Sequence, residues 1–198
     1  MIEIYTFEVN ASAPGTRADV VATEIDILSE MLRHRYGVEL QVELLKNSDK
    51  YSTFQSWLAQ LQLKSAPFFG EFGDLGRLYY LAHKAGIEIP QAPKILCLPE
   101  ATQISDPLGA HGYFSPASDT LNHTVVLSKY YPQIIYHEFL HMFGVEESYI
   151  TTSKQTIPGC AECWMQWEPS SGSGLAPERV AELKNYLLSH PECGQFVQ

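Results

Sequence analysis

Hydrophobic residues recur with two different periods in the first fifty residues. In IEIYTFEV (2–9) they alternate with polar residues, a pattern typical of a strand. Residues 17–37 carry apolar side chains at helical spacing instead, and this segment ends at Gly37, a residue that commonly terminates helices. Alternation returns in VELQVELL (38–45), which predicts a second strand.

The rest of the chain continues this mixture of helical and extended segments. The pattern predicts helices over 51–63 and 76–86, and strands over 94–99, 111–114 and 124–128. Another helix should begin at Pro132, because proline is favoured in a first helical turn. Residues 148–175 have an irregular pattern, whereas residues 176–190 predict a terminal helix with Pro177 and Glu178 in its first turn.

The order of these elements predicts an α/β (α+β) fold, in which helices pack on a mixed sheet. A helix would then carry the candidate site, and an irregular C-terminal part would end in a helix. The 198 residues suit a single domain, 1–198. We divide it into an N-terminal subdomain (1–144) with the sheet and the Pro132 helix, and a C-terminal subdomain (145–198) with the terminal helix.

Composition and charge narrow the range of partners. The formal charge is −10 and no Lys/Arg cluster is present, which argues against nucleic-acid binding. The negative charge favours solubility and weakly favours neutral or basic substrates. No window approaches 18 apolar residues, so no membrane partner is expected. The N-terminal residues lack the basic leader of a signal peptide, so we expect a cytoplasmic monomer, or a secreted protein if a leader has been removed.

The stretch YHEFLHMFGVEES (136–148) gathers groups that suit a zinc site. Residues four apart share a helix face at about 6 Å, so His137 and His141 can direct imidazole nitrogens at one metal ion. Glu138 lies about 100° around the helix, within reach of the water that the metal activates. There it can act as general base and then as general acid, which is the chemistry of the HExxH motif. The alternative is that both histidines are ordinary residues of an apolar core.

The third ligand is predicted from the residues that follow His141. Gly144 can adopt a positive φ and end the helix sharply, so the chain can return toward the same ion. Glu147 occupies the position of the last histidine in the extended motif HExxHxxGxxH, and we predict it as third ligand, with Glu146 facing solvent. Three other candidate ligands are less favoured: Glu162, which has the spacing of another class of zinc peptidase but lies in an irregular stretch, and His111 and His123, which precede the motif.

The segments HEFLHMFGVEE and CWM resemble the metzincin family of zinc peptidases. The resemblance implies that Met165 is the methionine of a Met-turn beneath the metal. The chain length and Cys163-x-Met165 look most like the archaemetzincin branch, which carries a second zinc ion on four cysteines. This chain has Glu147-Ser148 in place of that branch's His-Cys pair, and no C-x-x-C around Cys193. A single catalytic Zn²⁺ is therefore the expected cofactor.

The same resemblance implies an activity and a binding mode. The metal would lie at the floor of a cleft, and an extended substrate would add as a strand to an exposed sheet edge, for which GAHGYF (109–114) is the candidate. Some metzincin tyrosines donate a hydrogen bond to the oxyanion, which makes this a candidate role for Tyr149, but ordinary packing is the favoured role. The expected function is that of a zinc metalloendopeptidase acting on peptides or proteins. The alternative is a catalytically inactive, zinc-stabilised peptide-binding protein, which the presence of Glu138 disfavours.

The cysteines add little to this picture. Cys160 and Cys163 have C-x-x-C spacing, which alone is a weak signal for redox or metal chemistry. A disulfide between Cys193 and one of these two is one alternative in an exported protein, whereas free thiols are expected in a cytosol. Cys97, in ILCLP, is predicted to be a core residue.

Overall fold

The computed structural model describes residues 1–8, 14–46, 52–64, 75–99, 112–115, 123–150, 155–156, 164–165 and 174–197. The chain forms two compact units, one of residues 1–22 with 43–130 and one of residues 23–42 with 131–198. The predicted mixture of helices and a mixed sheet is confirmed. Among the described helices, none combines the length and the apolar character that crossing a bilayer requires. The predicted division into subdomains at residue 144 refers to the two sides of an expected substrate cleft, and it stays a prediction.

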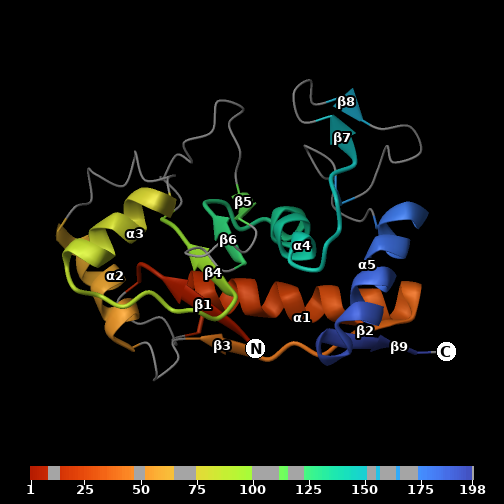
Figure 1. The fold of residues 1–198 in the computed structure, drawn as a ribbon, viewed down its shortest axis with the longest axis horizontal. Coiled ribbons are helices and arrows are strands. Elements are labelled where there is room, and N and C mark those ends of the chain that lie inside the picture. The colour runs from red at the N-terminus through yellow and green to blue at the C-terminus, as the bar shows by residue number, and fades with distance from the viewer. Residues whose placement is uncertain are drawn as a thin grey trace. The chain divides into compact units, whose positions relative to one another are not determined.

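The first unit contains a five-stranded sheet (Figure 1). Its strand order is β3 (Leu44–Lys46), β1 (Ile2–Thr6), β4 (Lys94–Cys97), β6 (Thr124–Leu127) and β5 (Gly112–Ser115). The first four strands are parallel, and β5 lies antiparallel to β6 at the edge. Every residue of β1, β4 and β6 is buried, as expected for parallel strands covered on both faces.

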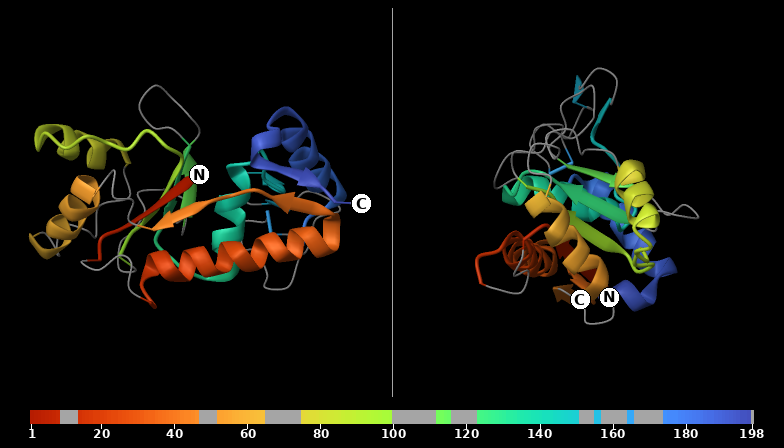
Figure 2. Two further views of the ribbon diagram at one scale, coloured as in Figure 1. Left: turned by 90° about the horizontal axis from the view of Figure 1, so that it is seen from below. Right: turned by 90° about the vertical axis from the view of Figure 1, so that its left-hand side faces the viewer.

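Two helices cover one face of this sheet. Helices α2 (Ser52–Lys64) and α3 (Leu75–Lys84) lie on the same side of the strands (Figure 2, left). Their apolar side chains join residues of the strands in one buried cluster, whose members include Tyr5, Leu96 and Val126 from the strands, Phe7 directly after β1, and Phe54, Leu58, Leu75 and Leu78 from the helices. Each such side chain contributes about 1.5–3 kcal/mol when it is removed from water, so this cluster holds the helices on the sheet.

A charged pair is buried beside this core. Glu3 and Lys94 are register neighbours on β1 and β4, and their exposed fractions are 2% and 1%. The Tyr5 hydroxyl donates a hydrogen bond of 2.6 Å to Glu3 Oε2. Burial lowers the pKa of Lys94 to about 8, although the negative charge of Glu3 opposes this shift. The pair therefore sits in the sheet at an electrostatic cost.

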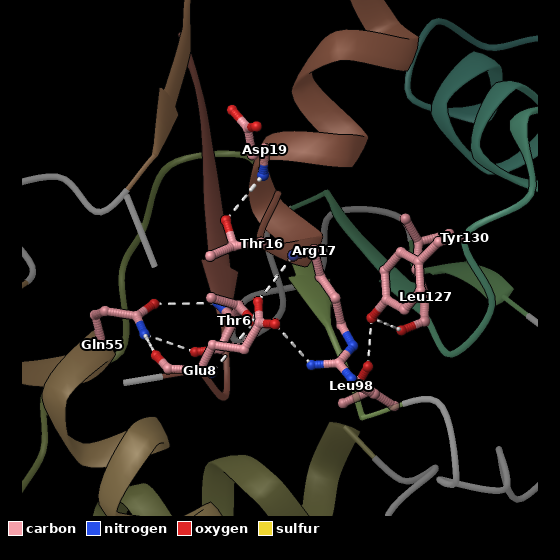
Figure 3. Close-up of polar contacts among 9 residues, drawn as sticks. All are labelled: Thr6, Glu8, Thr16, Arg17, Asp19, Gln55, Leu98, Leu127 and Tyr130. Atoms are coloured by element: carbon pink, nitrogen blue, oxygen red, sulfur yellow. Dashed lines mark hydrogen bonds and ion pairs between the residues drawn. The ribbon is translucent and has the colours of Figure 1, made fainter. Parts of the chain in front are cut away.

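Glu8 caps the 20-residue helix α1 (Arg17–Tyr36), whose residues are divided between the two units. Glu8 Oε2 accepts the backbone N–H of Arg17 at 2.8 Å, and Glu8 Oε1 accepts the Arg17 guanidinium at 3.0 Å (Figure 3). Gln55 of α2 donates to the Thr6 carbonyl at 2.6 Å and accepts the Thr6 N–H at 3.1 Å. A carboxylate at a helix N-terminus is stabilised by the helix dipole, so these polar contacts fix the end of β1, the start of α1 and α2.

The second unit contains α4 (Pro132–His141) and α5 (Pro177–Ser189). It also contains two small antiparallel sheets: β2 (Val38–Leu40) pairs with β9 (Gly194–Phe196), and β7 (Tyr149–Ile150) pairs with β8 (Gln155–Thr156). The pairing of β2 with β9 is visible in Figure 2 (left). A 3₁₀ turn, Pro191–Cys193, joins α5 to β9, so the predicted terminal helix is not the last element.

The single strand predicted over 38–45 is wrong. This segment forms two strands, because β2 pairs with the C-terminal β9 whereas β3 pairs with β1 in the other unit. Between them, the Gln41 N–H donates to the Cys193 carbonyl and the Glu43 carbonyl accepts the Ile2 N–H, both at 2.8 Å. Hydrophobic and polar residues alternate along most of the segment, but its first half pairs with β9 and its second half pairs with β1.

Two further predictions can be compared with this fold. Cys97 is fully buried in β4, which confirms it as a core residue, and burial raises its pKa. Cys193 is half-buried, and both thiols are free. Strand β5 lies at the edge of the sheet and contains residues 112–114 of the candidate substrate-binding segment. Residues 109–111 of that segment lie outside the described residues. Binding of a peptide along β5 stays a prediction.

Candidate metal centre

Helix α4 presents the central motif in a largely dry environment. It begins at Pro132, as predicted, and the six consecutive residues from Ile135 to Leu140 are all buried. His137 and Glu138 are each only 7% exposed. Since an ionisable side chain is rarely buried without a polar partner, we expect these two residues to contact polar groups of the same unit.

Both histidines have a fixed tautomer. His137 Nδ1 lies 2.8 Å from the Trp164 carbonyl oxygen, and His141 Nδ1 lies 2.7 Å from the Val145 carbonyl oxygen. A carbonyl oxygen can only accept, so each Nδ1 carries the hydrogen and donates it. In the neutral imidazoles, both Nε2 atoms then present a lone pair. In metal sites, the ring nitrogen that does not bind the metal commonly donates a hydrogen bond of this kind, which fixes the orientation of the histidine.

The two Nε2 atoms and one carboxylate form a small triangle. The Nε2 atoms of His137 and His141 are 3.3 Å apart. Glu147 Oε2 lies 3.3 Å from His137 Nε2, and Glu147 Oε1 lies 3.3 Å from His141 Nε2. The three contacts thus involve four electron-rich atoms, the two nitrogens and both carboxylate oxygens. Such atoms at this separation repel one another unless a proton or a cation lies between them.

The size of the triangle matches a tetrahedral zinc ion. With zinc–ligand distances of about 2.0–2.1 Å and angles of about 109°, neighbouring ligand atoms are about 3.3 Å apart. Glu147 Oε2 is also buried and has no hydrogen-bond partner among the described residues, apart from its ion pair with His137. A buried acceptor of this kind is the expected state of a ligand atom that faces a metal position. The residues present therefore fit a zinc ion.

Glu138 is the other carboxylate within reach. One oxygen of Glu138 and one nitrogen each of His137 and His141 all lie within 4.8 Å of one another, so Glu138 also could hold a metal ion. The 3.3 Å contacts of Glu147 with both histidines fit the zinc geometry more closely. This comparison favours Glu147 as ligand and leaves Glu138 beside the metal position.

The electrostatics of the four residues are coupled. Burial raises the pKa of Glu138, while the neighbouring histidines oppose this shift. Burial also acts to raise the pKa of Glu147, but its interactions with His137 and His141 in their protonated form outweigh it and hold that pKa far below its ordinary value. Burial acts to lower the pKa of His137, yet the hydrogen bond to Glu147 and the nearby carboxylates produce a net rise. A cation at the triangle, whether proton or metal, is thus stabilised.

Trp164 and Met165 contact His137 and the backbone next to Glu147. Both side chains are buried, and the Trp164 carbonyl is the acceptor for His137. The Trp164 ring makes an edge contact with Tyr136 at 5.3 Å between centroids, and the Tyr136 hydroxyl donates to Glu24 Oε2 at 2.8 Å. The Ser148 N–H donates to the Met165 carbonyl at 2.8 Å. This segment therefore touches both the motif helix and the chain next to Glu147.

A tight turn brings Glu147 to the histidines. Gly144 has φ +68°, in the left-handed region predicted for it, and its N–H donates to the His141 carbonyl at 3.1 Å. The side chain of Glu146 is 80% exposed, whereas that of Glu147 is 35% exposed. The turn therefore directs adjacent carboxylates in different directions, as predicted.

The structure places the other candidates as follows. His123 belongs to the first unit, where its ring makes an edge contact with Phe114 at 5.7 Å. The backbone of Tyr149 lies in β7, but its side chain is outside the described part of the chain. Four more candidates lie outside the described residues: His111, Glu162, Cys160 and Cys163.

The chain matches no protein-family model, and a search of the curated proteins gives no match. The site must therefore be judged by its own geometry. Sequence reasoning overlooked the carbonyls of Trp164 and Val145, because backbone acceptors leave no signal in residue types. It also overlooked Glu24, which lies on α1, more than a hundred residues before the motif.

Proposed function

We propose that this chain is a zinc-dependent metallopeptidase that hydrolyses peptide bonds. His137, His141 and Glu147 would hold the ion, and Glu138 would act as general base and general acid. The observation that carries the proposal is the close approach of the two imidazoles and one carboxylate: the Nε2 atoms are 3.3 Å apart, and each lies 3.3 Å from a different oxygen of Glu147. A zinc ion bound there supplies a Lewis acid that polarises a carbonyl and lowers the pKa of water to about 7.

The chain's own residues would perform the remaining steps. The Trp164 and Val145 carbonyls keep the hydrogen of each imidazole on Nδ1, so both Nε2 atoms stay available as ligands. Glu138 would accept a proton from the attacking water and pass it to the departing amine nitrogen. Burial raises the pKa of Glu138 in the metal-free protein, and a bound cation would act to lower it and so favour the carboxylate that accepts the proton.

The resemblance to metzincins supports the same assignment and adds Gly144 and Met165 to the residues that form the site. The HExxH spacing, Gly144 and Met165 are the features that carry it. Met165 is fully buried, and its neighbour Trp164 contacts His137. A peptide would be the substrate class, since the motif chemistry serves amide hydrolysis.

Four proteins test this proposal: the wild type, Glu138→Gln, Glu147→Ala and the adjacent control Glu146→Ala. Zinc content is measured by atomic absorption, and cleavage of a mixed peptide library is measured by mass spectrometry. We expect one zinc ion per chain in the wild type, in Glu138→Gln and in Glu146→Ala, and a sharp loss in Glu147→Ala. Cleavage should fall by about 10²–10⁴-fold in Glu138→Gln and stay unchanged in Glu146→Ala.

Three results would count against the proposal. A wild type that binds no zinc would contradict the assignment of the metal site. Equal cleavage by the wild type and Glu138→Gln would contradict the assignment of Glu138 as the general base. Stoichiometric zinc without cleavage of any peptide would favour a zinc-stabilised peptide-binding protein.

A further inference from the structure

The backbone on both sides of Glu147 is held by hydrogen bonds. On the C-terminal side, the Ser148 N–H donates to the Met165 carbonyl at 2.8 Å. On the N-terminal side, the Glu146 N–H donates to Glu182 Oε2 at 3.0 Å. Glu182 lies on α5, so this contact joins the turn after the motif helix to a helix that starts thirty residues later.

Glu182 is itself held in place by Arg179, one helical turn earlier on α5. The Arg179 guanidinium makes a short contact with Glu182 Oε1, and the same nitrogen lies 3.8 Å from Glu146 Oε2. The Arg179 side chain is only 13% exposed and that of Glu182 is 29% exposed. Each oxygen of Glu182 thus has one assigned partner: the guanidinium for Oε1 and the backbone N–H for Oε2.

The hydrogen bond to the Glu146 N–H affects the candidate ligand Glu147, because the two residues are neighbours in the chain. Rotation about the backbone at Glu146 would swing the next side chain, that of Glu147, away from the two histidines. A charge-assisted hydrogen bond to the Glu146 N–H resists that rotation more strongly than a neutral one would. The exposed side chain of Glu146 is not needed for this effect, because the backbone supplies the donor.

We propose that Glu182, oriented by Arg179, is a positioning residue that holds Glu147 at the metal ligand position. The inference rests on the proposed function, because it assigns a role in zinc binding. Glu182 does not touch the metal position; it acts through the backbone of Glu146. Partners that hydrogen-bond directly to a metal ligand alter metal affinity by about 10–100-fold when they are removed, and Glu182 acts one peptide unit further away, so the lower end of this range is expected.

The test measures the zinc dissociation constant of the folded protein by competition with a chromophoric chelator. Glu182→Ala should weaken zinc binding by about tenfold, and Glu182→Gln, which keeps a neutral acceptor, should give a smaller loss. Two controls should stay within about twofold of the wild type. Glu178→Ala removes an exposed carboxylate from the same helix, and Glu146→Ala keeps the backbone donor.

A second measurement separates positioning from a general effect on the fold. In a Glu147→Ala background, His137 and His141 remain as a weaker two-ligand site, and adding Glu182→Ala should change its zinc affinity by less than about twofold. The cobalt-substituted protein provides a spectroscopic check, because its visible absorption bands should shift in Glu182→Ala and stay unchanged in Glu178→Ala.

The outcomes are distinguishable. A wild type that binds no zinc overturns the proposed function and this inference with it. A wild type that binds zinc, together with Glu182→Ala and Glu182→Gln proteins that bind it equally well, overturns only this inference. The same result follows if Glu182→Ala weakens zinc binding as much in the Glu147→Ala background as in the wild type. Should Glu182→Ala fail to fold, the Glu182→Gln protein in both backgrounds decides the matter.

Discussion

Replacement of Gly144 by alanine tests whether the turn after the motif helix builds the candidate site. At φ +68° an L-residue is strained, which costs about 1–2 kcal/mol. An added Cβ would also lie 3.1 Å from Tyr186 Cδ2, closer than ordinary van der Waals contact. Tyr186 has little room to retreat, because its ring stacks on His190 at 4.1 Å between centroids and makes an edge contact with Phe143 at 5.8 Å.

Gly86→Ala is a matched control for the backbone strain. Gly86 has φ +67°, but a Cβ added there would meet nothing within 4 Å. Both substitutions reduce the freedom of the unfolded chain in the same way, so that contribution cancels between them. The remaining difference is the steric contact at position 144, and overpacking of this kind costs about 1–3 kcal/mol.

Urea unfolding of the metal-free proteins, followed by circular dichroism, measures both effects. We expect Gly144→Ala to lose about 1–3 kcal/mol more free energy of unfolding than Gly86→Ala. Zinc affinity should fall in Gly144→Ala and stay unchanged in Gly86→Ala, because only the first substitution displaces the turn that presents Glu147. Equal losses of stability, or unchanged zinc affinity in Gly144→Ala, would refute the reasoning.

Two predictions concern pH. Lys94 has a pKa of about 8 in the folded protein and 10.5 as the ordinary value, so its buried charge costs stability below pH 8 and this cost disappears as the pH rises toward 10.5. Relative to Lys94→Met, the wild type should therefore gain up to about 3 kcal/mol of unfolding free energy between pH 8 and 10.5, and parallel profiles would contradict this. The second prediction follows from the raised pKa of His137, since a metal must displace the proton that this pKa describes. Zinc affinity should fall by about tenfold for each unit of pH below that pKa, and calorimetry in buffers of different ionisation enthalpy should detect proton release. An affinity that does not change between pH 5 and 7.5 would contradict this expectation.

Local patterns predicted most of the regular elements for a simple physical reason. Helix α1 ends next to Gly37 and α4 starts at Pro132 because the terminating and initiating residues act within one helical turn. Strand β1 was predicted from the alternation of hydrophobic and polar residues, and β4 and β6 from short runs of mainly apolar residues. Such signals need no knowledge of distant parts of the chain.

The prediction over 38–45 was wrong because pairing depends on distant segments. The same alternating pattern serves β2 and β3, and only the positions of β9 and β1 decide which half joins which sheet. Strand β9 was not predicted at all, since its three residues acquire their conformation by pairing with β2.

The sequence by itself determined the candidate ligands His137 and His141, the neighbouring Glu138 and the turn at Gly144, because helical geometry relates residues within eight positions of one another. Tertiary structure alone decided which groups orient them. The Trp164 carbonyl reaches His137 from 27 residues away, and Glu182 reaches the Glu146 N–H from 36 residues away. These contacts depend on how separate segments pack, and packing is a property of the whole folded unit that no short spacing encodes.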